Sequence, residues 1–168
     1  MPRIQSIGIS RCIPLAILML FSSFSIAGTD LHWLWDNRCA ECHGHSADFA
    51  RQFLHISDGQ LQGAHPARDL KLFLRNHYSP TAEVDAIYSM LLAQVTTAPR
   101  FKAECSNCHD SASWFIRNSI IVQDGELVSR YSGKSVREFM QTHRKLDRDD
   151  IEFFMNLLTR VAGEVNPR

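Results

Sequence analysis

The stretch Cys39-Ala-Glu-Cys42-His43 is matched later in the chain of 168 residues by Cys105-Ser-Asn-Cys108-His109. Cys-x-x-Cys-His is the spacing for covalent attachment of haem. On one helical turn the two thiols reach the two vinyl groups of one porphyrin, and the next imidazole projects onto the iron. The sequence therefore predicts two haem c groups (iron), held by Cys39, Cys42, Cys105 and Cys108, with His43 and His109 as the proximal iron ligands.

Three other interpretations of these cysteines compete with haem attachment. An even number of cysteines in an exported protein is typical of a disulfide framework. A zinc ribbon also uses two Cys-x-x-Cys pairs, but such pairs are usually ~15–20 residues apart, and the interval from Cys42 to Cys105 is several times longer. A thioredoxin-like redox pair needs a βαβ context, and neither flank shows one. The histidine that follows both pairs favours haem attachment.

An internal repeat extends well beyond the two motifs. The offset from Cys39 to Cys105, applied without a gap, also pairs Asp58-Gly59 with Asp124-Gly125 and His77 with His143. A fixed period indicates duplicated structural units. We place these units at about 30–95 and 96–161, which divides the chain into a signal peptide (1–27) and domains at 28–95 and 96–168. Further matched pairs are Phe49/Phe115, Arg51/Arg117, Leu61/Leu127, Phe73/Phe139, Leu91-Leu92/Leu157-Leu158 and Val95/Val161.

The secondary structure is expected to follow this repeat. A helix over 31–38 leads into the first motif, and the clearest helices, 81–95 and 147–161, have Thr81 and Asp147 as N-caps. Shorter helices opened by Asp69 and Ser135 carry the segments up to His77 and His143. The Asp-Gly pairs predict turns, the second within a hairpin, and 96–100 is the expected linker.

The repeat also indicates the second iron ligand. If both units ligate iron in the same way, the second ligand should lie at matched positions. No methionine is matched: Met90 is paired with Asn156, Met140 with Leu74, and Met155 with Ser89. His77 and His143 are matched, each at the same interval after its proximal histidine, and are predicted to be the distal ligands. The alternative is a hydrogen-bonded helix histidine at each position, with Met140 or Met155 ligating the second iron. The first unit's other histidines, His32, His45, His55 and His65, are expected to be surface or local polar residues.

The segment 1–27 resembles an export signal. Arg3 and Arg11 precede an uncharged apolar run, and Ser25 and Ala27 are small residues where a signal peptidase cuts. We expect cleavage after Ala27 and a periplasmic location. An uncleaved membrane anchor is the alternative, although the run is shorter than the ~20 residues that cross a bilayer. Loss of both arginines leaves two more acidic than basic residues, so no nucleic-acid partner is expected.

The mature chain resembles class I-like c-type cytochromes, specifically tandem dihaem members. The resemblance rests on the two motifs, on the order helix, attachment site, loop and C-terminal helix, and on the aromatic pairs Trp35/Phe101 and Tyr88/Phe154. The resemblance implies a mainly α protein of two tandem small cytochrome c-like domains, each wrapped around one covalently bound haem. It also implies that the first and last helices cross beside the haem, with Trp35 near Tyr88 and Phe101 near Phe154. The family's usual loop methionine has no matched counterpart here, which argues against a high potential.

The expected function is electron transfer in the periplasm, with His/His ligation at both haems and redox proteins as partners. A cytochrome subunit of a membrane or periplasmic oxidoreductase complex would fit equally. The alternatives are a dihaem peroxidase-like enzyme, or a haem-based redox or gas sensor in which one ligand is displaceable. Arg51 and Arg117 are candidates for pairing with haem propionates, or are solvated helix charges.

Overall fold

The computed structural model describes residues 28–64, 69–77 and 82–167. These residues form ten helices and two small antiparallel hairpins, so the prediction of a mainly helical protein is confirmed. The expected signal peptide (1–27), the N-cap at Thr81 and the spare histidine at position 65 lie outside the described residues. None of the described helices combines the length and hydropathy needed to cross a bilayer.

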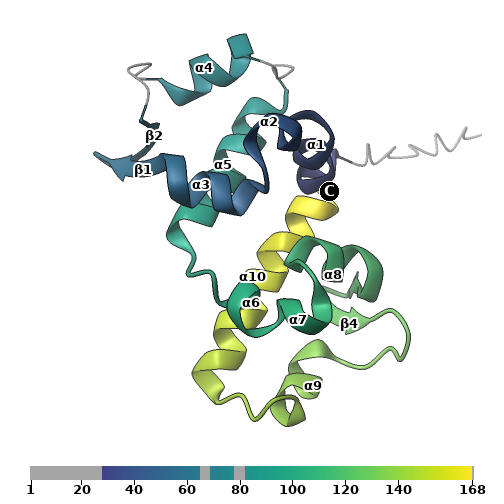
Figure 1. The fold of residues 1–168 in the computed structure, drawn as a ribbon. Helices are drawn as coiled ribbons and strands as arrows, with labels where there is room; N and C mark the ends of the chain where they lie inside the picture. The colour runs from purple at the N-terminus through teal and green to yellow at the C-terminus, as the bar shows by residue number, and fades with distance from the viewer. Residues whose placement is uncertain (1–27, 65–68, 78–81, 168) are drawn as a thin grey trace, which may run out of the picture.

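The same order of elements occurs twice along the chain (Figure 1). In the first repeat the elements are α1 (Leu31–Arg38), α2 (Ala40–His43), α3 (Ser46–Phe53), β1 (Leu54–Ser57), β2 (Gln60–Gly63), α4 (Leu70–His77) and α5 (Val84–Thr96). In the second they are α6 (Arg100–Glu104), α7 (Ser106–His109), α8 (Ala112–Ser119), β3 (Ile120–Gln123), β4 (Glu126–Ser129), α9 (Val136–Thr142) and α10 (Arg148–Val165). From α2 to β2 the bounds agree with the ungapped offset predicted from the sequence.

Polar side chains start several of these helices. The Asp30 carboxylate accepts from the backbone N–H of Trp33, and Ser135 accepts from the N–H of Glu138. Asp147 forms a capping box with Asp150, which confirms Asp147 as the N-cap of α10. Asp69 accepts from the N–H of Leu72 at the start of α4. Such caps satisfy backbone donors that the first helical turn leaves without partners.

Both Asp-Gly pairs are turns of two-residue hairpins. Asp58 and Gly59 have φ of 50° and 72°, and Asp124 and Gly125 have φ of 51° and 84°. Two successive positive φ angles define the type I′ turn, whose twist matches that of the flanking strands. Strand β1 pairs with β2 and β3 with β4, Ile56 opposite Leu61 and Val122 opposite Leu127. The sequence predicted the second hairpin but only a turn in the first repeat, where β1 and β2 carry more polar residues.

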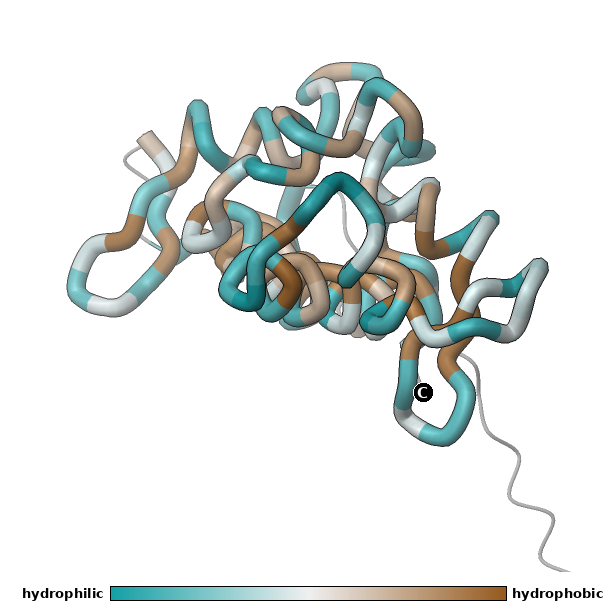
Figure 2. Tube along the Cα trace, turned by 90° about the horizontal axis from the view of Figure 1, so that it is seen from below, coloured by the Kyte–Doolittle hydropathy of each residue, from teal (hydrophilic) through white to brown (hydrophobic). Residues whose placement is uncertain are grey.

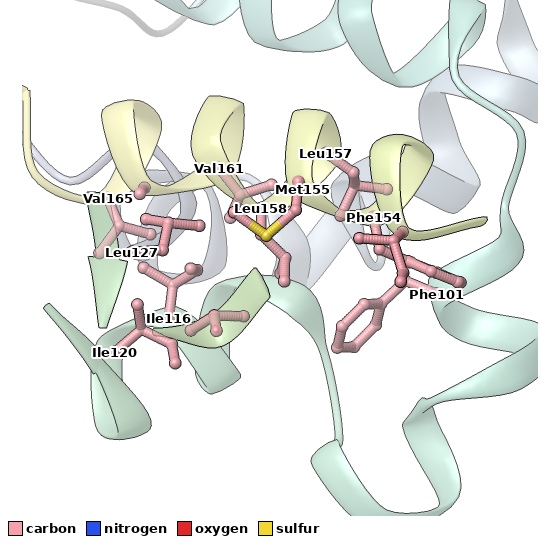
Figure 3. Packing of buried hydrophobic residues seen from close by; sticks show 13 residues of the cluster. Phe101, Ile116, Ile120, Leu127, Phe154, Met155, Leu157, Leu158, Val161 and Val165 are labelled. Atoms are coloured by element: carbon pink, nitrogen blue, oxygen red, sulfur yellow. The ribbon is translucent and has the colours of Figure 1, made fainter. Parts of the chain in front are cut away.

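Each repeat has its own hydrophobic cluster beneath its last helix. Along the trace, hydrophobic and hydrophilic positions alternate at short intervals around the helices (Figure 2), which is the pattern of amphipathic helices with one buried face. In the second repeat, Phe154 of α10 lies beside Phe101 of α6, and Val165 lies at the other end of α10 near Leu127 of the hairpin (Figure 3). Phe101 belongs to the same cluster as Phe154, and Trp35 to the same cluster as Tyr88, as the resemblance implied.

The last helices do not follow the ungapped offset. The buried side chains of α5 are Val84, Ile87, Met90, Leu91 and Gln94, and α10 buries Ile151, Phe154, Leu157, Leu158 and Val161 at the corresponding places. The members of each of these pairs are one position further apart than Cys39 and Cys105. Leu91 therefore corresponds to Leu158, and Ile87 to Phe154. The ungapped pairings in these helices were wrong: Tyr88 with Phe154, Leu91-Leu92 with Leu157-Leu158, and Val95 with Val161. The second repeat has one more residue than the first between its distal histidine and these buried positions, since Ile151 follows His143 by eight positions and Val84 follows His77 by seven.

The two repeats contact one another through several polar groups. The Nε2 of His32 lies 2.8 Å from a carboxylate oxygen of Glu164, and both residues are buried. Arg117 donates to Asp30 at 2.9 Å, and Lys102 lies 2.8 Å from Asp48. Helix α1 packs on α10 as well as on α5. The expected linker is shorter than predicted, since only residues 97–99 separate α5 from α6.

Candidate functional site

Each Cys-x-x-Cys-His motif forms one short helical turn. In the first, the N–H of His43 donates to the carbonyl of Cys39 at 2.9 Å, and in the second His109 donates to Cys105 at 3.0 Å. A backbone with positive φ, at Gly44 (66°) and Asp110 (59°), ends each turn. The turn places both cysteines and the histidine on one short segment, as attachment to a single macrocycle requires.

All four cysteines of the described chain are free thiols. Cys42 and Cys108 are exposed, while Cys39 and Cys105 are partly buried. Burial raises the pKa of the Cys39 and Cys105 thiols. Because the thiolate is the reactive form in disulfide exchange, this keeps both thiols in their less reactive state at neutral pH. The disulfide framework considered from the sequence is not formed in this part of the chain.

The histidines predicted as iron ligands lie together in both repeats. The ring centres of His43 and His77 are 6.0 Å apart with their planes at 61°, and those of His109 and His143 are 6.1 Å apart with their planes at 62°. The two histidines of each pair are far apart in sequence, at the same interval in both repeats. They face one another in nearly the same geometry in each repeat.

Burial favours the iron-binding form of one of these histidines. Desolvation lowers the pKa of His109, and the neighbouring His143 lowers it further. The neutral imidazole is the form that binds metals. The lowered pKa increases the neutral fraction of His109 at neutral pH.

A cavity surrounds each histidine pair. The cavity in the second repeat has a volume of about 430 Å³ and that in the first about 70 Å³. Many of their lining residues are at matched positions: Trp35/Phe101, Cys39/Cys105, His43/His109, Phe49/Phe115, Leu70/Val136, Phe73/Phe139, Leu74/Met140 and His77/His143. Cys108 also lines the second cavity. The residues chosen from the sequence as one site are therefore brought together in each repeat.

The two candidate methionines are in different places. Met140 lines the second cavity together with His143. Met155 is 5% exposed within the hydrophobic cluster under α10 and is not among the residues that line this cavity. Of the two, Met140 is thus the one placed to compete with His143.

Arg51 and Arg117 are both outside the two cavities. Arg51 donates to the backbone carbonyl of Gln94 at 3.2 Å, and Arg117 pairs with Asp30. The charged residues that do line the cavities are Arg38 and Glu83 in the first and Glu104, Lys134 and Arg144 in the second. Of these, Arg38 and Glu104 are matched in position but opposite in charge, so comparison of the two repeats gave no signal for them.

Two spare histidines of the first repeat, His32 and His45, line neither of these cavities. His32 was expected at the surface or as a local polar residue, but it is 7% exposed and bonded to Glu164 in the other repeat. His45 is partly buried, and desolvation lowers its pKa, although Asp48 opposes this effect. Both line a third cavity of about 360 Å³ between the repeats, which contains none of the four cysteines.

In the described part of the chain, no three His, Cys, Asp or Glu side chains gather closely enough to hold a metal ion by themselves. A haem iron needs fewer protein ligands, because the porphyrin nitrogens occupy its equatorial positions and leave two axial ones. Two facing histidines beside a pair of cysteines fit that requirement.

Comparisons with protein-family models, curated proteins and solved structures found no match to this chain. A functional assignment therefore depends on the motifs, the repeat and the geometry of the two sites.

Proposed function

We propose that this protein is a periplasmic dihaem c-type cytochrome that transfers electrons, with one haem in each repeat. Cys39 and Cys42 would hold the first haem, and Cys105 and Cys108 the second. His43 with His77, and His109 with His143, would be the axial ligands. When bound, each iron changes reversibly between two oxidation states and so carries one electron.

The spacing of the histidines is the observation that carries this proposal. A metal–imidazole bond is about 2 Å long and the ring centre lies about 1.1 Å beyond the nitrogen, so two imidazoles on opposite sides of one iron have centres about 6 Å apart. The observed separations are 6.0 and 6.1 Å. Two independent copies of one local sequence arrive at this value, each beside its own Cys-x-x-Cys pair.

The chain's own residues would hold the cofactors and shield them. The thiols fix each haem to the short turn that also carries the proximal histidine, so loss of the cofactor would require cleavage of covalent bonds. Apolar side chains such as Phe49, Leu74, Phe115 and Leu158 line the cavities and exclude water. Burial of an apolar macrocycle against them would supply core that a unit of this size lacks.

The second cavity lies within the volume range of cofactor pockets, roughly 300–1,000 Å³, and the first lies well below it. Haem binding in the first repeat thus requires the cavity to widen. Helix α4 carries Leu70, Phe73, Leu74 and His77 on one side of this cavity, opposite Ile87 and Leu91 of α5. The apolar side chains of these two helices would have to rearrange around the macrocycle while His43 and His77 keep their separation.

Intact-mass spectrometry tests the cofactor assignment. The full chain would be produced in a bacterial periplasm together with a haem-attachment apparatus, with an established c-type cytochrome as a positive control for that apparatus. We expect the mass of two added haems. The C39S/C42S and C105S/C108S variants should each lose one of the two, and a colourless chain of unmodified mass alongside a loaded control would overturn the proposal.

Ligation is tested with EPR spectra of the oxidised protein and with carbon monoxide added to the reduced protein. His77→Ala and His143→Ala should each remove one low-spin signal and open one iron to carbon monoxide, while the wild type binds none. Carbon monoxide binding to the wild type would instead favour the enzyme or sensor alternatives. If neither variant changed the spectra, the histidine pairs would not be the axial ligands.

A further inference from the structure

Every predicted iron ligand contacts a phenylalanine, and the contact geometry is the same in both repeats. On the proximal side, the rings of His43 and Phe49 are 4.7 Å apart at 63°, and those of His109 and Phe115 are 4.6 Å apart at 60°. On the distal side, Phe73 stacks on His77 at 4.8 Å and 20°, and Phe139 stacks on His143 at 4.7 Å and 28°.

The distal stacks follow from helix geometry. Phe73 precedes His77, and Phe139 precedes His143, by four residues, and positions i and i+4 are neighbours on a helix surface. His77 is the last residue of α4 and His143 is the C-cap of α9. The stacked phenylalanine ring therefore restricts the rotation of each distal imidazole.

Neither phenylalanine belongs to the hydrophobic clusters under the last helices. Phe73 and Phe139 instead line the cavities around the histidine pairs, where a bound macrocycle would cover them. What these two share is the position over a distal histidine.

The consequence is a fixed angle between the paired imidazoles. With a phenylalanine edge-on to the proximal ring and another stacked on the distal ring, the two imidazole planes cross at 61° in the first repeat and 62° in the second. The two angles agree closely although the surrounding cavities differ in volume.

We propose that Phe73 and Phe139 are positioning residues, which hold the planes of His77 and His143 crossed relative to the proximal imidazoles and so set the electronic structure of each iron. This inference rests on the proposed function, because it concerns the orientation of the ligands to a haem. Crossed imidazole planes direct their π orbitals toward different iron d orbitals and bring those orbitals close in energy. Parallel imidazole planes separate the energies of these d orbitals.

EPR spectroscopy distinguishes these cases. In the oxidised wild type, we expect each low-spin haem to show one large g value with the other features broad, rather than three well-resolved features. Phe139→Ala should shift the signal of the second haem and leave that of the first unchanged, and Phe73→Ala should do the reverse. A small change in the reduction potential of the affected haem should accompany each shift.

Three further variants separate ring stacking from other effects. Phe139→Tyr keeps the stacked ring and should retain the wild-type signal, whereas Phe139→Leu keeps apolar bulk without a ring and should behave like Phe139→Ala. Trp33→Ala removes an aromatic side chain that is 54% exposed, as Phe139 is, and that lines neither cavity, so it should leave both signals unchanged.

The result that overturns this inference differs from the one that overturns the proposed function. If Phe73→Ala and Phe139→Ala left both signals and potentials unchanged, while His77→Ala and His143→Ala still removed them, the haem assignment would stand and the positioning role would fail. The same holds if Phe139→Leu matched the wild type. If the wild-type protein carried no haem, both the proposed function and the positioning role would be overturned.

Discussion

The imidazole of His32 in α1 and the carboxylate of Glu164 in α10 lie 2.8 Å apart, although 132 residues separate them in sequence. Both side chains are buried, and Glu164 also pairs with Arg160. The first helix of one repeat is thereby bonded to the last helix of the other. This contact ties the two otherwise similar halves into one structure.

Replacement of His32 by alanine should destabilise the protein. A buried hydrogen-bonding group that loses its partner costs about 1–3 kcal/mol, and His32→Ala leaves Glu164 with Arg160 alone. Urea denaturation of the haem-loaded protein would measure the change in the free energy of unfolding. Arg137→Ala is the matched control, because it breaks an exposed pair with Glu152, and exposed ion pairs contribute little to stability. Equal effects of the two substitutions would contradict a stabilising role for the buried pair.

The one-residue shift between the last helices can be tested by core truncation. Leu91 and Leu158 are 1% and 0% exposed, and they are equivalent only if the offset in this region is one position longer than between the motifs. Leu91→Ala and Leu158→Ala should each cost about 2–5 kcal/mol. Leu92, the equivalent of Leu158 in the ungapped alignment, is only partly buried, so Leu92→Ala should cost clearly less. Thermal denaturation of the three variants measures this, and a larger effect at Leu92 than at Leu91 would exclude the shifted register.

Arg100 should make the stability of the protein depend on pH. Hydrogen bonds from Arg100 lower the pKa of Glu104 and of Asp150. A carboxyl group with a lowered folded-state pKa contributes stability above its unfolded pKa, about 4, and loses it as the pH falls through the folded value. Arg100→Gln should therefore lower the melting temperature at neutral pH, and its difference from the wild type should shrink below about pH 4.

The control for this experiment is Arg130→Gln. Arg130 donates to the backbone carbonyl of Ile120 and not to a carboxylate. Its effect on the melting temperature should stay constant between neutral and acidic pH. A constant difference for Arg100→Gln as well would show that the two carboxyl groups do not couple to it.

The export signal gives a prediction that needs no spectroscopy. N-terminal sequencing of protein purified from the periplasm should start at Gly28, since we expect cleavage after Ala27. Ala27→Pro or Ala27→Leu should slow processing, because the peptidase requires a small residue there. Mature protein that begins at Met1 in the membrane fraction would instead indicate the uncleaved anchor.

Much of the fold could be predicted from the sequence because the two repeats can be aligned with each other. The second copy shows which positions are matched, and it identified the histidine pairs, the Asp-Gly turns and the N-caps at Asp69, Ser135 and Asp147. Helix α1 was predicted over its full length, since its neighbours, a capping aspartate and the first cysteine, define both ends.

The remaining features depend on contacts that a repeat cannot reveal. The bond between His32 and Glu164 joins positions that have no like counterpart in the other copy, so comparison of the two copies gives no signal for it. Arg51 and Arg117 match in sequence, yet one bonds to a carbonyl of its own repeat and the other to Asp30 of the opposite repeat. The extra residue between His143 and the buried face of α10 was missed because an offset without a gap still pairs leucine with leucine in that helix.

The backbone N–H of Gly28 donates to the carbonyl of Pro167 at 3.1 Å, so the two ends of the described chain meet. A gene could therefore be rearranged to open the polypeptide at 97–99 and to join residue 167 to residue 28, which would reverse the order of the repeats. Such circular permutation is tolerated where ends lie close together and the new break falls in a short connection. In the permuted protein the second repeat would be synthesised before the first, while the folded structure would stay the same.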